Sequence, residues 1–109
     1  MVAVTELGYV GLTVSDPDAW KKYASECIGL EVYDENEPDR FYLRMDNWHH
    51  RFVMHTGASD DLAYMGWRVA GEPELHEMEA LLRENGVEYS VGTIEENEER
   101  RVLGHLKLN

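Results

Sequence analysis

The same pattern of apolar and polar positions occurs twice along this chain. Residues 9–16 (YVGLTVSD) are echoed by residues 64–71 (YMGWRVAG), an offset of 55 positions, and each copy leads into a segment of helical periodicity. A supersecondary unit repeated at a fixed offset is the sequence signature of a fold assembled from similar modules. The repeat therefore predicts two modules of one architecture.

The first copy predicts a β-α-β-β-β unit. Residues 7–14 are apolar and β-rich, and Asp16 followed by Pro17 is typical of the start of a helix. The apolar positions that follow recur at helical spacing and are expected to face a sheet: Trp20, Tyr23, Ala24, Cys27 and Ile28. Gly29 is expected to end this helix. Short strands are then predicted at residues 30–33, 41–45 and 48–55.

The second copy has the same order but stops earlier. It predicts a strand at 62–69, a helix from Pro73 to just before Gly86, and a strand at 87–91. A short helical turn capped by Thr93 and a strand at 102–108 follow, with no counterpart of 48–55. We therefore expect an α+β fold of two βαβββ modules, residues 1–57 and 58–109, the second lacking its last strand.

The gap in the second module is expected to need filling from elsewhere. Without a last strand, the backbone of 62–69 would lack partners, and each buried unpaired group costs on the order of 1–3 kcal/mol. The rest of a longer polypeptide, a second fragment or a strand from another copy would each satisfy it.

Composition narrows the possible partners. The 109 residues carry a formal charge of −12, which disfavours nucleic acid and anionic membranes because phosphate binding depends on Lys and Arg. No apolar run approaches the roughly 18 residues of a membrane span, and no signal-peptide pattern is present, so a cytoplasmic protein is expected. Cys27 is the single cysteine and is expected to be a buried thiol.

The wording of several segments carries a family resemblance: residues 6–16 (ELGYVGLTVSD), 41–46 (FYLRMD), 48–51 (WHHR), 60–68 (DDLAYMGWR) and 100–104 (RRVLG). With the paired modules, they resemble the N-terminal domain of type I extradiol dioxygenases, most closely the 2,3-dihydroxybiphenyl 1,2-dioxygenases of the vicinal oxygen chelate (glyoxalase/bleomycin resistance) superfamily. The likeness runs from about Val4 to Leu108. The chain departs from the family in length, because the segment expected after Asn109 is not present.

The resemblance implies a two-domain enzyme that opens a catechol ring beside its hydroxyl pair, with O2 and Fe(II). In that family two His and one Glu of the C-terminal domain hold the iron, so we expect no catalytic, cofactor-binding or metal-binding residue in this chain. Tyr9 and Tyr64 stand where metal-binding members of the superfamily commonly have His. A phenol, with a reference pKa near 10, is a poor replacement for imidazole.

The histidines are the other candidates for metal chemistry. In a strand at 48–55, His49 and His50 would point to opposite faces, and His49 and His55 would lie about 20 Å apart, so they form no chelate by themselves. His50 could still meet His105 or a carboxylate across the sheet. Structural or interfacial roles are therefore expected for all of them, and His76 is expected to be solvated.

The remaining clusters are interpreted as structural. Glu95, Glu96, Glu98 and Glu99 lack the pattern of a calcium loop and are expected to form a solvated acidic turn, with Arg100 and Arg101 pairing with them or capping a helix. The three tryptophans are expected to pack in the core or between domains: Trp20, Trp48 and Trp67.

Three functional hypotheses stay open. The first is the non-catalytic N-terminal domain of an extradiol dioxygenase, packed on a catalytic half within a homo-oligomer. The second is a metal-free module that binds an aromatic ligand in a cleft lined by Trp67, Tyr9, Phe52 and Tyr64. The third is an inactive strand-exchanged assembly. The particular catechol, the oligomeric state and the origin of the truncation are not determined by these patterns.

Overall fold

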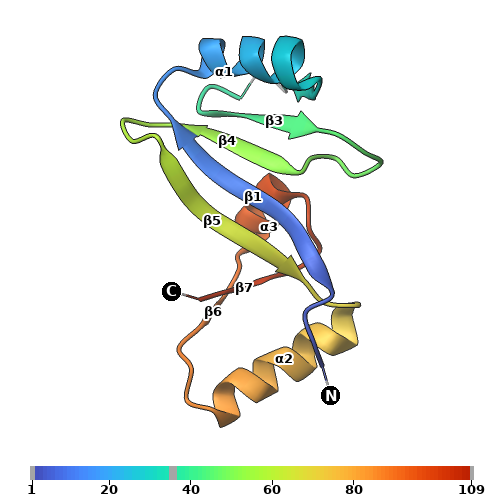
Figure 1. Cartoon of the computed structure of the whole chain (residues 1–109). Coiled ribbons are helices and arrows are strands. Elements are labelled where there is room, and N and C mark those ends of the chain that lie inside the picture. Colours follow the sequence, from blue (N-terminus) through green and yellow to red (C-terminus); the bar gives the residue numbers. More distant parts are fainter. Residues whose placement is uncertain (1, 35–36, 109) are drawn as a thin grey trace. The chain divides into compact units, whose positions relative to one another are not determined.

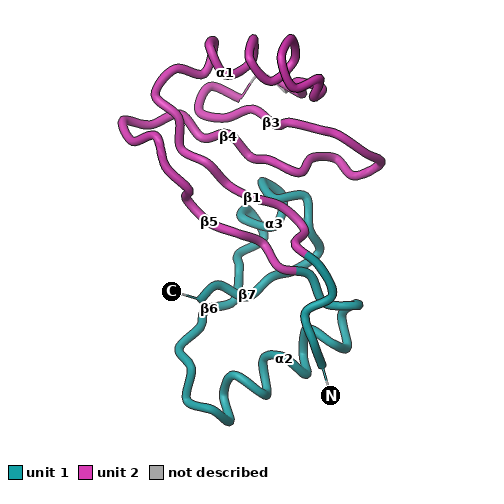
Figure 2. Tube along the Cα trace, viewed as in Figure 1, with its two compact units in different colours: residues 1–6, 68–109 teal, residues 7–67 magenta. Residues whose placement is uncertain are grey.

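The computed structural model describes residues 2–34 and 37–108 (Figure 1). Two compact units divide the chain: a sheet unit of residues 7–67, and a helix unit of residues 1–6 and 68–109 (Figure 2). The sheet unit contains the strands β1 (Glu6–Val14), β2 (Glu31–Tyr33), β3 (Arg40–Arg44), β4 (Phe52–Thr56) and β5 (Asp61–Arg68), with α1 (Pro17–Tyr23) and η1 (Ala24–Ile28). β1 begins one residue before this unit, and β5 ends one residue beyond it.

A mixed sheet in the order β2-β3-β4-β1-β5 organises the sheet unit. β1 and β4 are parallel, with Val10 opposite Phe52 and Val14 opposite Thr56, whereas β2, β3 and β4 pair antiparallel. β5 lies on the other side of β1 and runs opposite to it (Figure 1). Parallel neighbours need a crossover, which the segment from α1 to β3 supplies. β4, which falls in the last strand predicted for residues 1–57, thus lies beside β1, the first of them.

The core of this unit lies between the sheet and the helix. Five buried residues form it: Val14, Ala24, Phe41, Leu43 and Met54. Trp20 packs against them from α1, as its place in the apolar stripe predicted. The helix begins where the sequence indicated, because Asp16 Oδ1 accepts a hydrogen bond from the Ala19 amide at 3.1 Å and Pro17 takes the first position.

The second half of the predicted helix corrects one expectation. Residues 24–28 form a π-helical turn, in which the Gly29 amide donates to the Ala24 carbonyl at 2.9 Å. A π turn advances each residue by a smaller angle than an α turn, so positions beyond Ala24 rotate away from the stripe. Cys27 is exposed and Ile28 is 52% exposed, so the buried thiol expected at Cys27 was wrong. Gly29 ends the turn with a φ of 87°, as expected.

The strand predicted at 48–55 is also shorter than expected. β4 begins at Phe52, and residues 48–51 follow a bend instead of an alternating strand. The Asp46 carboxylate explains the bend: Oδ1 accepts from the Trp48 amide at 3.1 Å and Oδ2 accepts from Arg51 Nε at 2.7 Å. The chain wraps around this carboxylate because an Asx-type turn competes with the strand ladder.

The helix unit contains α2 (Glu72–Glu84), β6 (Ser90–Val91), α3 (Ile94–Arg100) and β7 (Leu106–Lys107). β6 and β7 pair antiparallel over two residues each, so the strands predicted at 87–91 and 102–108 are mostly irregular. α3 has the predicted cap in full: Thr93 Oγ1 accepts from the Glu96 amide at 3.1 Å, and Glu96 Oε1 accepts from the Thr93 amide at 3.0 Å. Gly86, with a φ of 68°, follows α2 as expected.

Candidate functional site

Aromatic and histidine rings gather in the sheet unit, away from the core. Val53 and Tyr42 are opposite each other in β4 and β3, and they alternate with Met54 and Phe41, which face α1. We call the group the ring cluster, and its members are Tyr9, Tyr42, His49, His50, His55 and Tyr64. The cluster contains the histidines and tyrosines that the sequence analysis considered as candidate metal ligands.

Tyr9 and Tyr64 pack on each other across β1 and β5. Their ring centroids lie 6.1 Å apart at an interplanar angle of 81°. Each ring also lies over a glycine of the neighbouring strand: a Cβ on Gly11 would overlap the Tyr64 ring, and a Cβ on Gly66 would overlap the Tyr9 ring. The two phenol rings therefore cover the glycines of this strand pair on one face of the sheet.

The Tyr64 hydroxyl is also committed to a neighbour. It lies 2.7 Å from His55 Nε2, a hydrogen-bonding distance, with the direction set by the imidazole tautomer. The prediction that His55 has a structural role is consistent with this bond. No local sequence pattern predicts this bond, because residues 55 and 64 lie on non-neighbouring strands of the sheet.

His49 and His50 correct a second expectation. Their Nδ1 atoms lie 3.0 Å apart, so the two imidazoles meet instead of pointing to opposite faces. The bend at 48–51 removes the alternation on which the expectation rested. Tyr42 packs on both rings, with centroids 4.6 Å from His50 and 5.0 Å from His49, and His50 is only 5% exposed.

Iron does not fit this cluster. A 2-His-1-carboxylate site needs a third, acidic ligand beside the imidazoles. Within residues 2–34 and 37–108, no group of three or more His, Cys, Asp or Glu side chains is placed to hold a metal ion. The His49–His50 contact is satisfied as a hydrogen bond, in which one Nδ1 donates and the other accepts.

The acidic turn at α3 is more ordered than the solvated turn that the sequence suggested. Glu96 Oε2 accepts from Lys107 Nζ at 2.7 Å. That bond and the Thr93 amide lower the pKa of Glu96 to about 2, against desolvation that would raise it. Glu95 and Glu98 are exposed, as expected. Glu96 is thus a structural acid that ties the start of α3 to β7.

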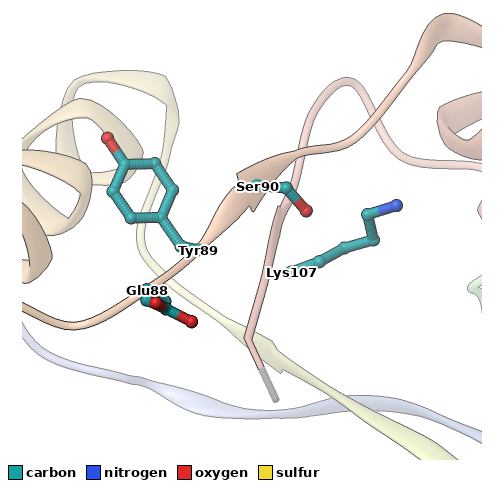
Figure 3. Close-up of a pocket in the computed structure, with 4 residues that line it drawn as sticks. All are labelled: Glu88, Tyr89, Ser90 and Lys107. Carbon is teal, nitrogen blue, oxygen red and sulfur yellow. The ribbon is translucent and has the colours of Figure 1, made fainter.

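A shallow open pocket of about 350 Å³ lies beside β6 (Figure 3). Its lining residues are Glu88, Tyr89, Ser90 and Lys107. The Tyr89 ring is turned to the opposite side of the strand from Ser90 (Figure 3), and its hydroxyl donates to Glu79 Oε1 at 3.0 Å. Because the Lys107 amine is already bound to Glu96, few polar groups converge on this space.

The cleft suggested for an aromatic ligand is not formed. Tyr9 and Tyr64 contact each other in the ring cluster, but Phe52 packs against the core that faces α1. Trp67 is three residues from Tyr64 in the same strand, so it points to the other face, where it is 57% exposed. The four residues therefore divide between the two faces of the sheet and cannot line one cavity.

The other tryptophan predictions have mixed outcomes. Trp48 is 48% exposed and holds the Arg51 guanidinium 5.7 Å from its ring centroid. Neither Trp48 nor Trp67 lies in the core of the sheet unit, in contrast to Trp20. His76 on α2 is exposed, as predicted, with Nε2 3.7 Å from a Glu72 carboxylate oxygen.

Comparison with protein families gives this arrangement a context. Residues 7–57 match the family described as "Dihydroxybiphenyl dioxygenase BphC D1". The chain is 58% identical over 108 residues to "Biphenyl-2,3-diol 1,2-dioxygenase" of Sphingomonas paucimobilis, covering 99% of this chain and 36% of that protein. It is 55% identical over 105 residues to "1,2-dihydroxynaphthalene dioxygenase" of Pseudomonas putida, covering 96% and 35%.

Solved structures agree in fold. A catechol 2,3-dioxygenase superimposes with a TM-score of 0.97 at 54% identity, covering 100% of this chain and 36% of that one. BphC, a halotolerant catechol dioxygenase, superimposes with a TM-score of 0.85 at 30% identity, covering 94% and 35%. The fold is therefore that of the vicinal oxygen chelate proteins, as the sequence suggested.

The family resemblance is thus confirmed: this chain is similar to the N-terminal part of extradiol dioxygenases. More narrowly, residues 7–57 match the first domain of the dihydroxybiphenyl dioxygenase type. The chain spans about a third of the length of the curated relatives that it matches. Across the described ranges, we find no helix with the length and apolar character to cross a membrane.

Proposed function

We propose that this chain is the N-terminal, non-catalytic part of an iron-dependent extradiol dioxygenase that opens the ring of a bicyclic catechol. The observation that carries the proposal is the 58% identity to a biphenyl-2,3-diol dioxygenase over 99% of the chain. Relatives at 52–55% identity are named for 1,2-dihydroxynaphthalene. Both substrates are two-ring aromatics with adjacent hydroxyl groups, so this is the substrate class that we assign.

The composition of the ring cluster supports placing the iron site outside this chain. A relative from Rhodococcus jostii, 34% identical, is named as an iron-dependent extradiol dioxygenase. The described residues of this chain do not fit an iron site, and the rings of Tyr9 and Tyr64 pack on each other over the glycines of β1 and β5. We therefore assign the iron and the reacting groups to the remainder of the parent enzyme.

The role left to this chain is architectural. The repeat supports the two modules 1–57 and 58–109, the second of which would be completed by the C-terminal part or by a second fragment. β5 is the last strand in the sheet order and carries Leu62, Met65 and Trp67, each about half exposed. We assign this strand to contacts with the catalytic part, within a cytoplasmic homo-oligomer.

A comparison of two lengths of the protein tests this assignment. Residues 1–109 and the full-length natural protein are each supplied with Fe(II), O2 and biphenyl-2,3-diol or 1,2-dihydroxynaphthalene, and oxygen uptake and the coloured ring-cleavage product are followed. Only the full-length protein is expected to turn over. Iron-dependent product from residues 1–109 alone would contradict the assignment.

A pair of conservative variants tests the claim about the phenols. Tyr9→Phe and Tyr64→Phe remove one oxygen each and leave the ring packing in place. In the full-length protein, kcat and iron content should stay within about twofold of the unmodified enzyme, since neither phenol would bind iron. A loss of bound iron with an unchanged melting temperature would show that a phenol is a ligand after all.

A further inference from the structure

A buried histidine joins the second helix of the helix unit to its strand pair. His105 is 8% exposed and precedes β7. Its Nδ1 lies 2.6 Å from Oδ1 of Asn97, which belongs to α3. The His105 carbonyl also accepts from the Gly92 amide at 2.9 Å, next to β6. One residue thus contacts all three elements of this corner.

The imidazole has almost no room to move. A Cβ on Gly92 would overlap the His105 ring, so the ring packs directly on the backbone there. The backbone of Asn97 is also held in place. Its backbone amide donates to the Thr93 carbonyl at 2.9 Å, and its backbone carbonyl accepts from the Val102 amide at 3.0 Å. If the ring turned outward, it would lose its bond to Asn97.

The hydrogen bonds determine the protonation state of the ring. Oδ1 of Asn97 can only accept, so Nδ1 of His105 carries the proton. Nε2 is then the unprotonated nitrogen, and it is buried with no hydrogen-bond partner among the described residues. A proton added at Nε2 would create a buried donor and a buried charge with nothing to accept it.

The surrounding charges do not favour that proton. The charges of Arg100 on α3 and Lys107 on β7 both oppose a positive charge on the ring. Glu96 of α3 favours it, but that carboxylate is bound to Lys107. Gly92 brings no charge, and α2 reaches this corner through Leu75, which lies next to Gly104. Burial first, and then Arg100, lower the pKa of His105 below its usual value of 6.5.

We propose that His105 is an acid-sensitive latch: in its neutral form it holds α3 on the β6–β7 pair, and protonation releases α3. The sign follows from the lowered pKa. The open state binds a proton more readily than the closed state, so the latch is complete above about pH 6.5 and weakens as the pH falls through the pKa of the closed state. The opening equilibrium rises up to about tenfold for each unit that separates the two pKa values.

Hydrogen–deuterium exchange on the full-length natural protein tests the latch. Amides of residues 95–101 should lose protection between pH 7.5 and pH 5.0, after correction for intrinsic exchange rates. His105→Gln cannot be protonated and should remove this pH dependence. His76→Gln is the matched control, because His76 is exposed on α2 and its replacement should leave the dependence unchanged.

A second variant covers the case in which His105→Gln does not fold. Asn97→Asp places a carboxylate against Nδ1, which should raise the pKa of His105 and make α3 more protected at pH 5.0 than the unmodified protein is. Exchange of the imidazole C2 hydrogen reports the same pKa directly. An imidazole pKa of 6.5 or higher in the unmodified protein would overturn the proposal, as would an Asn97→Asp protein that opens in acid to the same extent.

Discussion

Replacing Gly11 with alanine is predicted to destabilise the protein, although this change normally stabilises a strand. Alanine restricts the unfolded chain more than glycine does, which favours folding by about 0.4–1 kcal/mol where the backbone conformation is compatible. At Gly11 the new methyl group would overlap the Tyr64 ring. The outcome therefore depends on whether that ring can move.

The structure indicates that the Tyr64 ring moves only at a cost. Its hydroxyl is hydrogen-bonded to His55 at 2.7 Å, and its ring contacts Tyr9 at 6.1 Å between centroids. Forcing a methyl group into a packed site costs about 1–3 kcal/mol. Set against the entropic gain, the free energy of unfolding should fall by about 1–2 kcal/mol.

Urea denaturation followed by circular dichroism measures this change, with Gly104→Ala as the control. A Cβ at Gly104 meets only Leu75 Cδ2, at an ordinary 3.6 Å, so stability should change by less than about 0.5 kcal/mol. In a Tyr64→Ala background the steric cost should vanish and only the entropic gain should remain, so the coupling energy should equal the steric cost of about 1–3 kcal/mol. Additive single and double variants would refute the steric reasoning.

Three further predictions rest on individual contacts. Glu96→Gln should abolish the acid sensitivity of α3 between about pH 4.5 and 2, because the lowered carboxyl pKa stabilises the fold above pH 4.5 and this stability is lost as the pH falls. Amide hydrogen exchange of α3 as a function of pH measures this, and an unchanged profile would contradict the Lys107 bond. Cys27 in residues 1–109 should react with a thiol reagent within about tenfold of the rate in urea, whereas strong native protection would show a buried thiol. Asp16→Ala should lower the free energy of unfolding by about 1 kcal/mol in urea melts, because it removes the bond to the Ala19 amide; no change would mean that the cap is not needed.

Local signals in the sequence were sufficient for the ends of the helices. Asp16 with Pro17 predicted the start of α1, and Thr93 with its glutamates predicted α3. These features involve partners within about four residues, so a sequence pattern contains both sides of each interaction. The repeat and the apolar alternation in the same way indicated the order of the elements and the fold.

The ring cluster was less predictable, because its contacts join distant residues. The sequence placed Tyr9 and Tyr64 at equivalent positions in two repeats, but their mutual packing depends on β1 and β5 being neighbours. The meeting of His49 and His50 depends on a bend held by the Asp46 carboxylate, which overrides the alternation of a strand. The His55–Tyr64 bond and the burial of His105 likewise left no local trace.

The sequence by itself therefore determined most of the succession of strands and helices, since capping residues and apolar periodicity are read from residue types at fixed spacings. The family resemblance came from the wording of whole segments. Only the tertiary structure decided that a π turn exposes Cys27, that glycines make room for the rings of Tyr9 and Tyr64, and that Asn97 fixes the proton on His105. The physical reason is the separation along the chain between the residues that interact. Capping and periodicity act within a few residues, whereas ring packing and buried hydrogen bonds depend on which strands become neighbours.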